Sequence, residues 1–317
     1  MKLRECGLGC HIGGVFVGAF GYADDVIILA PSRLALQKML DICENFAIEH
    51  SMQFSTDSNP SKSKTKCILF SRTISNENVK NVLLNGNELP WVESAKHLGN
   101  LLDNKINYRF MSPDTKMDLR QKRAIFFQRC HQIMQQFGQY HPQMVTHLLT
   151  VYATSFYGSS LWSLTSEEFV KLCKSWNTAT RLIWDLPIGT HTRLLEAIST
   201  VPHLELVLES RYIGFVNGLN NSKKPIIKLL FNVVSSNLNT VTGSNISYLC
   251  GKHAIASISS LLESKHILRN KQRRPLSQDE LWKIDIIEDI SLSKKGMIDL
   301  DFDPNDLEAI LNNVCVS

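Results

Sequence analysis

The chain has 317 residues and a formal net charge of +4, with 44% apolar and 20% charged residues. A chain of this length usually forms two or three domains, and this balance of apolar and charged residues excludes wholesale disorder. Because the charge is only mildly basic, it does not by itself indicate a nucleic-acid-binding protein.

The cysteines and the first residues indicate the compartment. Eight cysteines are scattered without regular spacing. Residues 1–10 lack the apolar core of a secretory signal peptide, and no stretch approaches the roughly 18 apolar residues of a membrane span. The sequence therefore predicts a nuclear or cytoplasmic protein with free thiols, neither secreted nor membrane-bound. Cys6, Cys10 and His11 are close in sequence, but their irregular spacing argues against a zinc site.

Strand patterns dominate the chain up to residue 105. Two apolar runs, Val15–Phe20 and Val26–Ala30, flank a short polar centre and predict a β-hairpin. Ser32 is placed to cap the helix predicted over Arg33–His50, whose apolar residues fall on one face. Three further β-elements are predicted: a strand at Cys67–Phe70, a hairpin around the turn Asn85–Asn87, and one strand that includes Lys96–Gly99 and ends at Leu102.

Helical patterns dominate after Pro113. They predict helices over Thr115–Phe137, Met144–Trp162, Glu167–Trp184, Arg193–Ser199 and Leu204–Leu219. Residues 235–247 are rich in Ser, Asn and Thr and predict a linker, followed by short helices near Asp279–Ile290 and Pro304–Val314. The predicted fold class is α+β, with a first part over residues 1–110, a helical part over 111–234, and a linker with helical segments over 235–317.

The sharpest chemical feature is Tyr22-Ala23-Asp24-Asp25 at the tip of the first hairpin. Two adjacent carboxylates on rigid strands can coordinate hard divalent cations such as Mg²⁺ or Mn²⁺, which prefer oxygen ligands. In a two-metal site, such ions activate an attacking hydroxyl group and stabilise the leaving oxygen. The alternative is structural, because aspartate is common in turns without any metal.

An ordered series of motifs from Gly9 to Leu219 resembles the reverse transcriptases of non-LTR (LINE-type) retrotransposons. The hairpin Phe20–Val26 with Leu29-Ala30 looks like polymerase motif C, and the helix Leu36–Ile48 looks like the one that follows it in the family. The matches that follow are Asn59–Cys67 (motif D), Lys96–Gly99 (the primer-gripping motif), and Tyr157–Ser159, Leu161-Trp162, Trp176-Asn177, Arg181, Trp184, Leu186-Pro187 and Thr190-His191 (the thumb). The resemblance implies a partial polymerase palm followed by a mostly helical thumb.

The resemblance also implies roles for individual residues. Asp24 and Asp25 would be catalytic metal ligands, and Tyr22 would lie beside the primer end. Lys64 is the preferred motif D lysine, acting near the incoming nucleotide as a charge or a proton donor. Lys62 and Lys66 are close rivals, and all three lysines could instead form a solvated turn. Lys96, His97 and Gly99 would steady the primer strand. The implied partners are an RNA template and a DNA primer.

The predicted helix Thr115–Phe137 carries Lys116, Arg120 and Arg123 on one face. As part of a thumb, this face would contact backbone phosphates without reading sequence; alternatively, it is an ordinary solvated helix surface. The tryptophans Trp162, Trp176 and Trp184 are expected in the core rather than as base-stacking platforms.

One part of the family pattern is missing. The family places another catalytic aspartate on a strand well before the hairpin, whereas residues 1–19 hold a single acidic group, Glu5. We therefore expect a truncated RNA-directed DNA polymerase without independent catalysis. The alternative is a non-catalytic nucleic-acid-binding remnant or a domesticated interaction protein. The hairpin would also keep an open strand edge, through which a second chain could pair.

Overall fold

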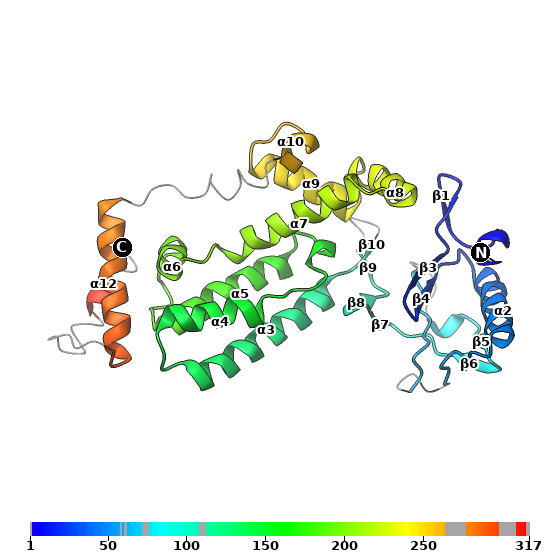
Figure 1. Cartoon of the computed structure of the whole chain (residues 1–317), viewed down its shortest axis with the longest axis horizontal. Coiled ribbons are helices and arrows are strands. Elements are labelled where there is room, and N and C mark those ends of the chain that lie inside the picture. The colour runs from blue at the N-terminus through cyan, green and yellow to red at the C-terminus, as the bar shows by residue number, and fades with distance from the viewer. Residues whose placement is uncertain are drawn as a thin grey trace. The chain divides into compact units, whose positions relative to one another are not determined.

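The computed structural model describes residues 2–57, 59, 62–71, 76–107, 112–263, 277–297 and 309–314. Its helices and small antiparallel sheets confirm the predicted α+β class (Figure 1). The chain divides into two compact units. The first consists of Met1–Asp114 with Lys223–Val233, and the second of Thr115–Ser222 with Val234–Ser317. No helix in the described part of the chain combines the length and the apolar character that a membrane crossing requires.

The strands of the first unit form separate hairpins. The pairs are β1 (His11–Ile12) with β2 (Val15–Phe16), β3 (Ala19–Tyr22) with β4 (Asp25–Ile28), β5 (Val82–Leu84) with β6 (Asn87–Leu89), β7 (Ser94–His97) with β8 (Asn100–Asp103), and β9 (Ile106–Asn107) with β10 (Ser112–Pro113). Among the described residues each strand pairs only with its neighbour in sequence, so no larger sheet forms there.

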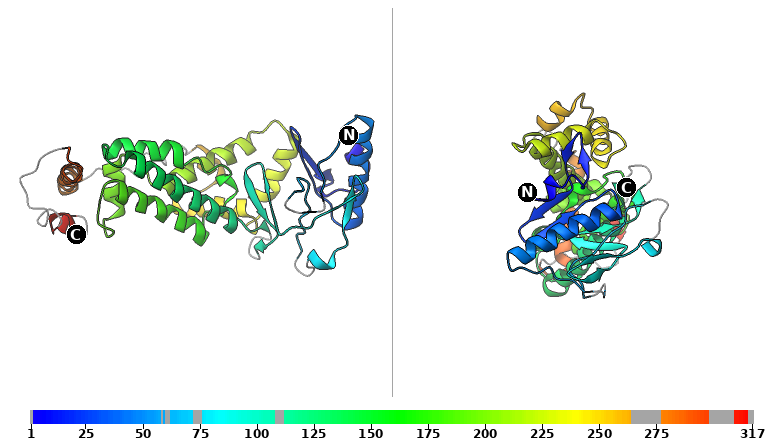
Figure 2. Two further views of the ribbon diagram at one scale, coloured as in Figure 1. Left: turned by 90° about the horizontal axis from the view of Figure 1, so that it is seen from below. Right: turned by 90° about the vertical axis from the view of Figure 1, so that its right-hand side faces the viewer.

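In the described residues of this unit, four helical elements accompany the hairpins. They are α1 (Lys2–Glu5), α2 (Arg33–Glu49), the 3₁₀ helix η1 (Asn76–Asn78) and α8 (Pro225–Ser235). The predicted cap of α2 is confirmed, since the Ser32 side chain accepts a hydrogen bond from the backbone N–H of Ala35 at 3.2 Å. Helix α2 lies beside β5 (Figure 2). Its Gln37 side chain satisfies both backbone groups of Leu83, accepting at 2.8 Å and donating at 3.0 Å, and so occupies an open strand edge.

A small apolar core holds the first unit together. Its buried members are Leu40, Cys67, Val82, Leu84 and Leu89, with Ile28, Leu36, Phe54 and Trp91 packed against them. The core therefore joins α2, the β5–β6 hairpin and the base of β4.

The second unit is helical. It includes α3 (Lys116–Phe137), α4 (Pro142–Ala153), the 3₁₀ helix η2 (Ser159–Leu161), α5 (Glu167–Ile183), α6 (Thr192–Ser199), α7 (Leu204–Asn220), α9 (Val241–Lys252), α10 (Ile258–Glu263) and α12 (Gln278–Lys294). Helices α3, α4 and α5 lie side by side (Figures 1 and 2). The expectation for the tryptophans is confirmed, because Trp162, Trp176 and Trp184 are at most 3% exposed. Two buried indole N–H groups find acceptors: Trp162 donates to Asp118 at 2.7 Å and Trp184 to Thr146 at 3.2 Å.

Two predicted helical boundaries are wrong. The helix expected over Met144–Trp162 ends at Ala153, because Phe156 and Gly158 adopt positive φ angles of 34° and 82° that no α-helix accommodates. The linker expected over residues 235–247 gives way to helix α9 at Val241. Thr240 caps that helix by accepting from the Gly243 N–H at 3.0 Å, so a composition typical of loops conceals a helix start. Helix α8 was not predicted.

Three predicted strands also differ from the structure. The single strand expected from Lys96 to Leu102 is the β7–β8 hairpin, because Leu98 and Gly99 form a turn with φ angles of 44° and 79°. The expected strand Val15–Phe20 is divided into β2 and β3, and Cys67–Phe70 contributes a single bridge from Cys67 to Trp91. The domain boundaries at residues 110 and 234 stay predictions, and residues 108–111 at the first of them lie outside the described part.

Candidate functional site

The hairpin of β3 and β4 presents the acidic tip. Tyr22 pairs with Asp25 across the ladder, so their side chains share one face, and Ala23-Asp24 form the two-residue turn. The structure thus gives a tighter turn than the sequence predicted, with Asp25 inside β4. Ala23 has a φ of 53°, a left-handed conformation that costs a residue with a Cβ atom about 1–2 kcal/mol. The hairpin tolerates this strain directly beside the carboxylate pair.

The two carboxylates are accessible and uncommitted. Asp24 and Asp25 are exposed, and neither carboxylate forms a hydrogen bond or an ion pair with another described residue. Free carboxylate oxygens are the ligands that Mg²⁺ and Mn²⁺ prefer. However, the described residues contain no group of three or more His, Cys, Asp or Glu placed to share one ion. The tip therefore offers part of a coordination shell.

That finding also covers the amino-terminal cysteines. Cys6 donates to the Leu3 carbonyl at 3.0 Å, and His11 contacts the Gly9 carbonyl at 2.9 Å through Nδ1. Both side chains contact nearby backbone carbonyl groups, and neither belongs to a group of potential metal ligands among the described residues.

The lysine segment after Pro60 is ordered by backbone contacts. The Ser63 hydroxyl is buried and donates to the Thr65 carbonyl at 2.5 Å, while the Thr65 N–H and hydroxyl donate to the Ser55 carbonyl at 3.2 and 2.9 Å. The stretch is a series of turns and bends in which Ser63 is buried and Lys62, Lys64 and Lys66 are exposed.

The lysine segment and the acidic hairpin are both attached to the apolar core of the first unit. Cys67, directly after the last lysine, is buried in the same core cluster against which Ile28 of β4 packs. Asp25 lies three residues before Ile28 on β4, and Lys64 lies three residues before Cys67 in the chain. No hydrogen bond or ion pair joins Lys64 to Asp24 or Asp25 among the described residues.

The predicted primer-gripping residues lie at the tip of the β7–β8 hairpin. Lys96 is exposed and His97 half-buried at the end of β7, and Gly99 is exposed in the turn. The three residues are close in sequence, and in the structure they lie together at the tip of a hairpin. The Leu98 φ of 44° adds a second strained turn to this unit.

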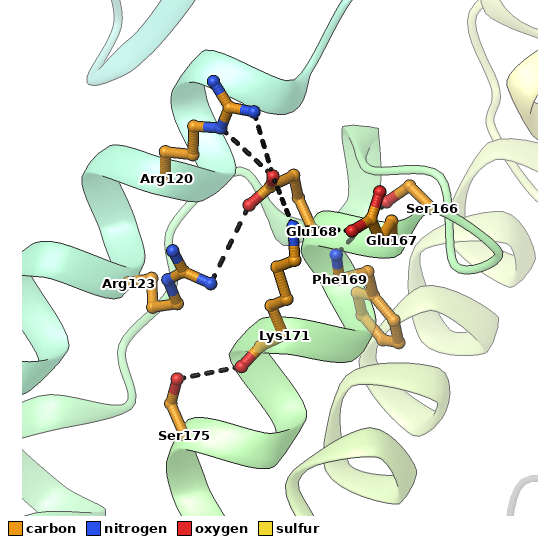
Figure 3. Close-up of polar contacts among 8 residues, drawn as sticks. All are labelled: Arg120, Arg123, Ser166, Glu167, Glu168, Phe169, Lys171 and Ser175. Carbon is orange, nitrogen blue, oxygen red and sulfur yellow. Dashed lines mark hydrogen bonds and ion pairs between the residues drawn. The ribbon is translucent and has the colours of Figure 1, made fainter.

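The basic face of α3 is partly neutralised (Figure 3). Glu168, at the start of α5, accepts from Arg120 Nε and Nη2, each at 3.1 Å from Oε1, and its Oε2 lies 3.9 Å from Arg123 Nη1. Lys171 Nζ lies 3.4 Å from the same Oε1 and 2.7 Å from Glu167 Oε1. The predicted helix is confirmed, but two of its three named cations belong to an ion-pair cluster.

The electrostatics of this cluster follow from its burial. The Glu168 side chain is 5% exposed, whereas that of Arg120 is 55% exposed. Burial, the largest single influence, raises the pKa of Glu168, but the hydrogen bonds and charges of Arg120 and Lys171 together outweigh it, so the pKa lies below its ordinary value. Glu168 thus stays ionised and anchors cations whose outer N–H groups still face solvent.

Glu168 and Lys171 are functional candidates that the sequence did not reveal. An acidic residue in the first turn after a Ser cap is an ordinary helix-dipole feature. Helical spacing encodes the pairs of Lys171 with Glu167 and Glu168. Only the packing of α3 against α5 brings Arg120 and Arg123 to Glu168, and no spacing along one segment encodes that contact.

The second unit also holds a small cavity of about 150 Å³, lined by Cys173, Asn177, Thr192, His203, Leu204 and Glu205. Burial raises the pKa of Cys173 to about 12, so its thiol stays protonated and is a poor nucleophile. Nearby, the buried Glu209 accepts from Lys252 at 2.7 Å and lies 3.1 Å from His253 Nε2. These contacts join α7 to α9 and account for the buried charges as structural pairs.

Comparison with known proteins adds no assignment, since no protein family, curated protein or solved structure matches this chain. The function must therefore be argued from the residues themselves.

Proposed function

We propose that this chain is the part of an RNA-directed DNA polymerase that carries a metal-binding hairpin and a helical thumb, related to the reverse transcriptases of non-LTR retrotransposons. In this proposal the first unit is a partial palm and the second includes the thumb. The motif series in the sequence supports the assignment, with Asp24 and Asp25 as metal ligands and Lys64 near the nucleotide phosphates.

The observation that carries the proposal is the state of the acidic tip. Two adjacent carboxylates lie exposed and unpaired at a strained hairpin turn. A purely structural aspartate in a turn commonly bonds to nearby backbone N–H groups, which neither carboxylate does among the described residues. Strained backbone persists where the surroundings impose it, often at functional sites. The arrangement suits ligands held ready for a divalent cation.

The same geometry argues that the chain does not polymerise nucleotides by itself. A two-metal centre holds both ions with carboxylates that approach from more than one strand. Asp24 and Asp25 come from a single turn, so an ion bound there alone would keep most of its water ligands. We propose that another strand must supply the remaining carboxylate before the site becomes catalytic.

Primer extension on an RNA template tests this claim. We expect the purified chain with Mg²⁺ to show no extension above an Asp24→Ala control. Extension that the Asp24→Ala substitution abolishes would show that the chain, or a second copy of it, already completes the site, and would contradict the incomplete-centre argument.

A second candidate function is non-catalytic nucleic-acid binding through the cluster around Glu168. The supporting observation is that Arg120, Arg123 and Lys171 gather around one buried carboxylate and keep outward N–H donors (Figure 3). Phosphate contacts release counterions, so affinity should fall steeply with salt. We expect Arg120→Ala to reduce the slope of log affinity against log salt concentration by about one. Binding without a salt slope would refute these phosphate contacts.

A further inference from the structure

Helices α3 and α4, with the segment that follows, hold a single acidic residue, Asp118, which is buried and bonded to Trp162. Between residues 119 and 166 there is no Asp or Glu, whereas there are four cations, Arg120, Lys122, Arg123 and Arg129. The acidic groups that face this region from α5 are Glu167 and Glu168, which already pair with Lys171 and the arginines of α3. A surface with this excess of positive charge attracts polyanions.

The segment after α4 is held in a fixed, strained shape. Phe156 has a φ of 34° and is 4% exposed, with its ring centroid 6.0 Å from that of Phe126 and 6.1 Å from that of Trp162. Gly158 follows with a φ of 82°. The turn buries one aromatic ring in the core and leaves the next residue, Tyr157, in solvent.

Two arginines fix the same segment from neighbouring helices. Arg129 of α3 donates through Nη1 to the Tyr152 carbonyl at 2.8 Å, and Arg211 of α7 donates through Nη1 to the carbonyls of Thr154 and Ser155 at 2.9 and 3.2 Å. These bonds satisfy carbonyl groups at the carboxyl end of α4. A carbonyl carries no net charge, so both guanidinium groups remain positive, and both arginine residues are exposed. Burial lowers the pKa of Arg211 without removing its charge at neutral pH.

Two large aromatic side chains are presented there. Tyr152 is 63% and Tyr157 is 61% exposed, five residues apart on a backbone that the arginines and Phe156 hold in place. Exposed rings on mobile loops are common, but rings fixed beside positive charge match the chemistry of single-stranded nucleic-acid sites, where bases stack on aromatic side chains and cations follow the backbone.

We infer that Tyr152 and Tyr157 form a stacking platform for unpaired bases of a single-stranded nucleic acid, whose phosphates lie near Arg129 and Arg211. The inference deepens the proposed function, because it names the form of nucleic acid that the second unit binds. A protein partner fits less well, since residues 119–166 carry basic side chains and no acidic ones.

Fluorescence anisotropy with two labelled oligonucleotides of equal length tests the inference. One is oligothymidylate, and the other is an abasic strand with the same phosphates and no bases. We expect Tyr152→Ala and Tyr157→Ala each to weaken oligothymidylate binding by about 5- to 100-fold and to leave the weaker abasic binding unchanged. Tyr152→Phe and Tyr157→Phe should retain most of the affinity, because the ring is kept.

Trp282→Ala, which removes a 58% exposed ring from α12, is the matched control and should leave binding unchanged. Circular dichroism should show all these variants folded, since the altered rings are exposed. Equal binding of both oligonucleotides, an absence of binding to either, or an unchanged affinity in the alanine variants would overturn the inference. The assay does not depend on metal binding at Asp24. The inference can therefore fail while the metal-site proposal holds, or hold while that proposal fails.

Discussion

The two units of this chain handle charge in opposite ways. In the first, Asp24 and Asp25 lie in solvent without a partner among the described residues. In the second, the acidic residues Asp118, Glu168 and Glu209 are buried and paired with an indole, with arginines and with a lysine. A buried charge is tolerated only when it is paired, so the second unit uses carboxylates to join helices. In the first unit the adjacent carboxylates of Asp24 and Asp25 instead stay exposed at a hairpin tip.

Their cores differ in the same way. The first unit gathers a few aliphatic side chains under α2 and leaves Phe20, Tyr22 and Val26 of its hairpin at least 44% exposed. The second packs Phe126, Trp162 and Trp176 into one core. Exposed apolar residues on a two-stranded hairpin fit the expected open edge, and self-association through that edge stays a prediction. The stability of the whole chain should therefore depend mainly on the helical unit.

The largest expected effect is at Trp162. Trp162→Ala should destabilise the second unit by about 3–5 kcal/mol, because it empties part of the aromatic core and leaves the buried Asp118 carboxylate without its indole donor. Urea unfolding followed by circular dichroism measures the loss. Trp282→Ala removes an exposed tryptophan from the same unit and should change little. Equal effects of the two substitutions would mean that Trp162 is not a core residue.

The next effect is at Gly18 in the first unit. A Cβ atom built on Gly18 would lie 2.7 Å from the Gly9 Cα atom, a backbone contact that cannot yield easily. We expect Gly18→Ala to destabilise the first unit by about 1–3 kcal/mol, measured as faster hydrogen exchange in its amide groups. Gly21→Ala, where nothing lies within 4 Å, is the matched control. If both variants exchange alike, the close approach of the two glycines is absent.

A smaller effect, about 1–2 kcal/mol, is expected from Glu168→Gln at pH 7, since its cation partners are partly solvated. The pKa of Glu168 is lowered on folding, so its contribution is present above its ordinary pKa of 4.5 and is lost as pH falls below that value. The difference between wild type and variant should therefore shrink in acid.

Measuring unfolding free energies of wild type and Glu168→Gln from pH 7 to pH 3 checks this sign. Glu167→Gln, at a side chain that is 79% exposed, should have no measurable effect. A difference that grows on acidification would contradict the assigned ion pairs.

The smallest effect is at the strained turn. Ala23→Gly relieves a left-handed alanine at φ 53°, but glycine also raises the entropy of the unfolded chain, so we expect stabilisation of at most about 1 kcal/mol. Hydrogen exchange in the β3–β4 hairpin measures it. Ala35→Gly, inside helix α2, should instead destabilise by up to about 1 kcal/mol. Destabilisation by Ala23→Gly would show that the turn is not strained.

Turn chemistry shows how far the sequence could be read. The hairpin at Asn85-Gly86 was predicted because both residues accept the positive φ angles, 52° and 72°, that the turn requires. The hairpin at Leu98-Gly99 has similar angles, but leucine disfavours them, so local sequence indicated a continuous strand. Tertiary context imposes that turn, and it falls within the predicted primer-gripping segment.

The candidate site divides in the same manner. Asp24 and Asp25 were predicted from adjacent letters, since a hairpin tip is encoded locally. Glu168 was not predicted, because its role in the cation cluster depends on Arg120, 48 residues earlier, and on how α3 packs against α5. The exposed Tyr152 and Tyr157 were likewise hidden, because a helix was expected to continue through the strained Phe156.

The central claim is that the hairpin tip binds a divalent cation through Asp24. Titrating Mn²⁺ into the isotope-labelled chain and recording paramagnetic broadening of backbone amide signals tests it most directly. The account predicts broadening centred on Gly21–Val26 that Asp24→Asn removes and that Asp41→Asn, at another exposed carboxylate of the same unit, leaves intact. Broadening that is absent from the tip, or that persists unchanged in Asp24→Asn, would contradict the account.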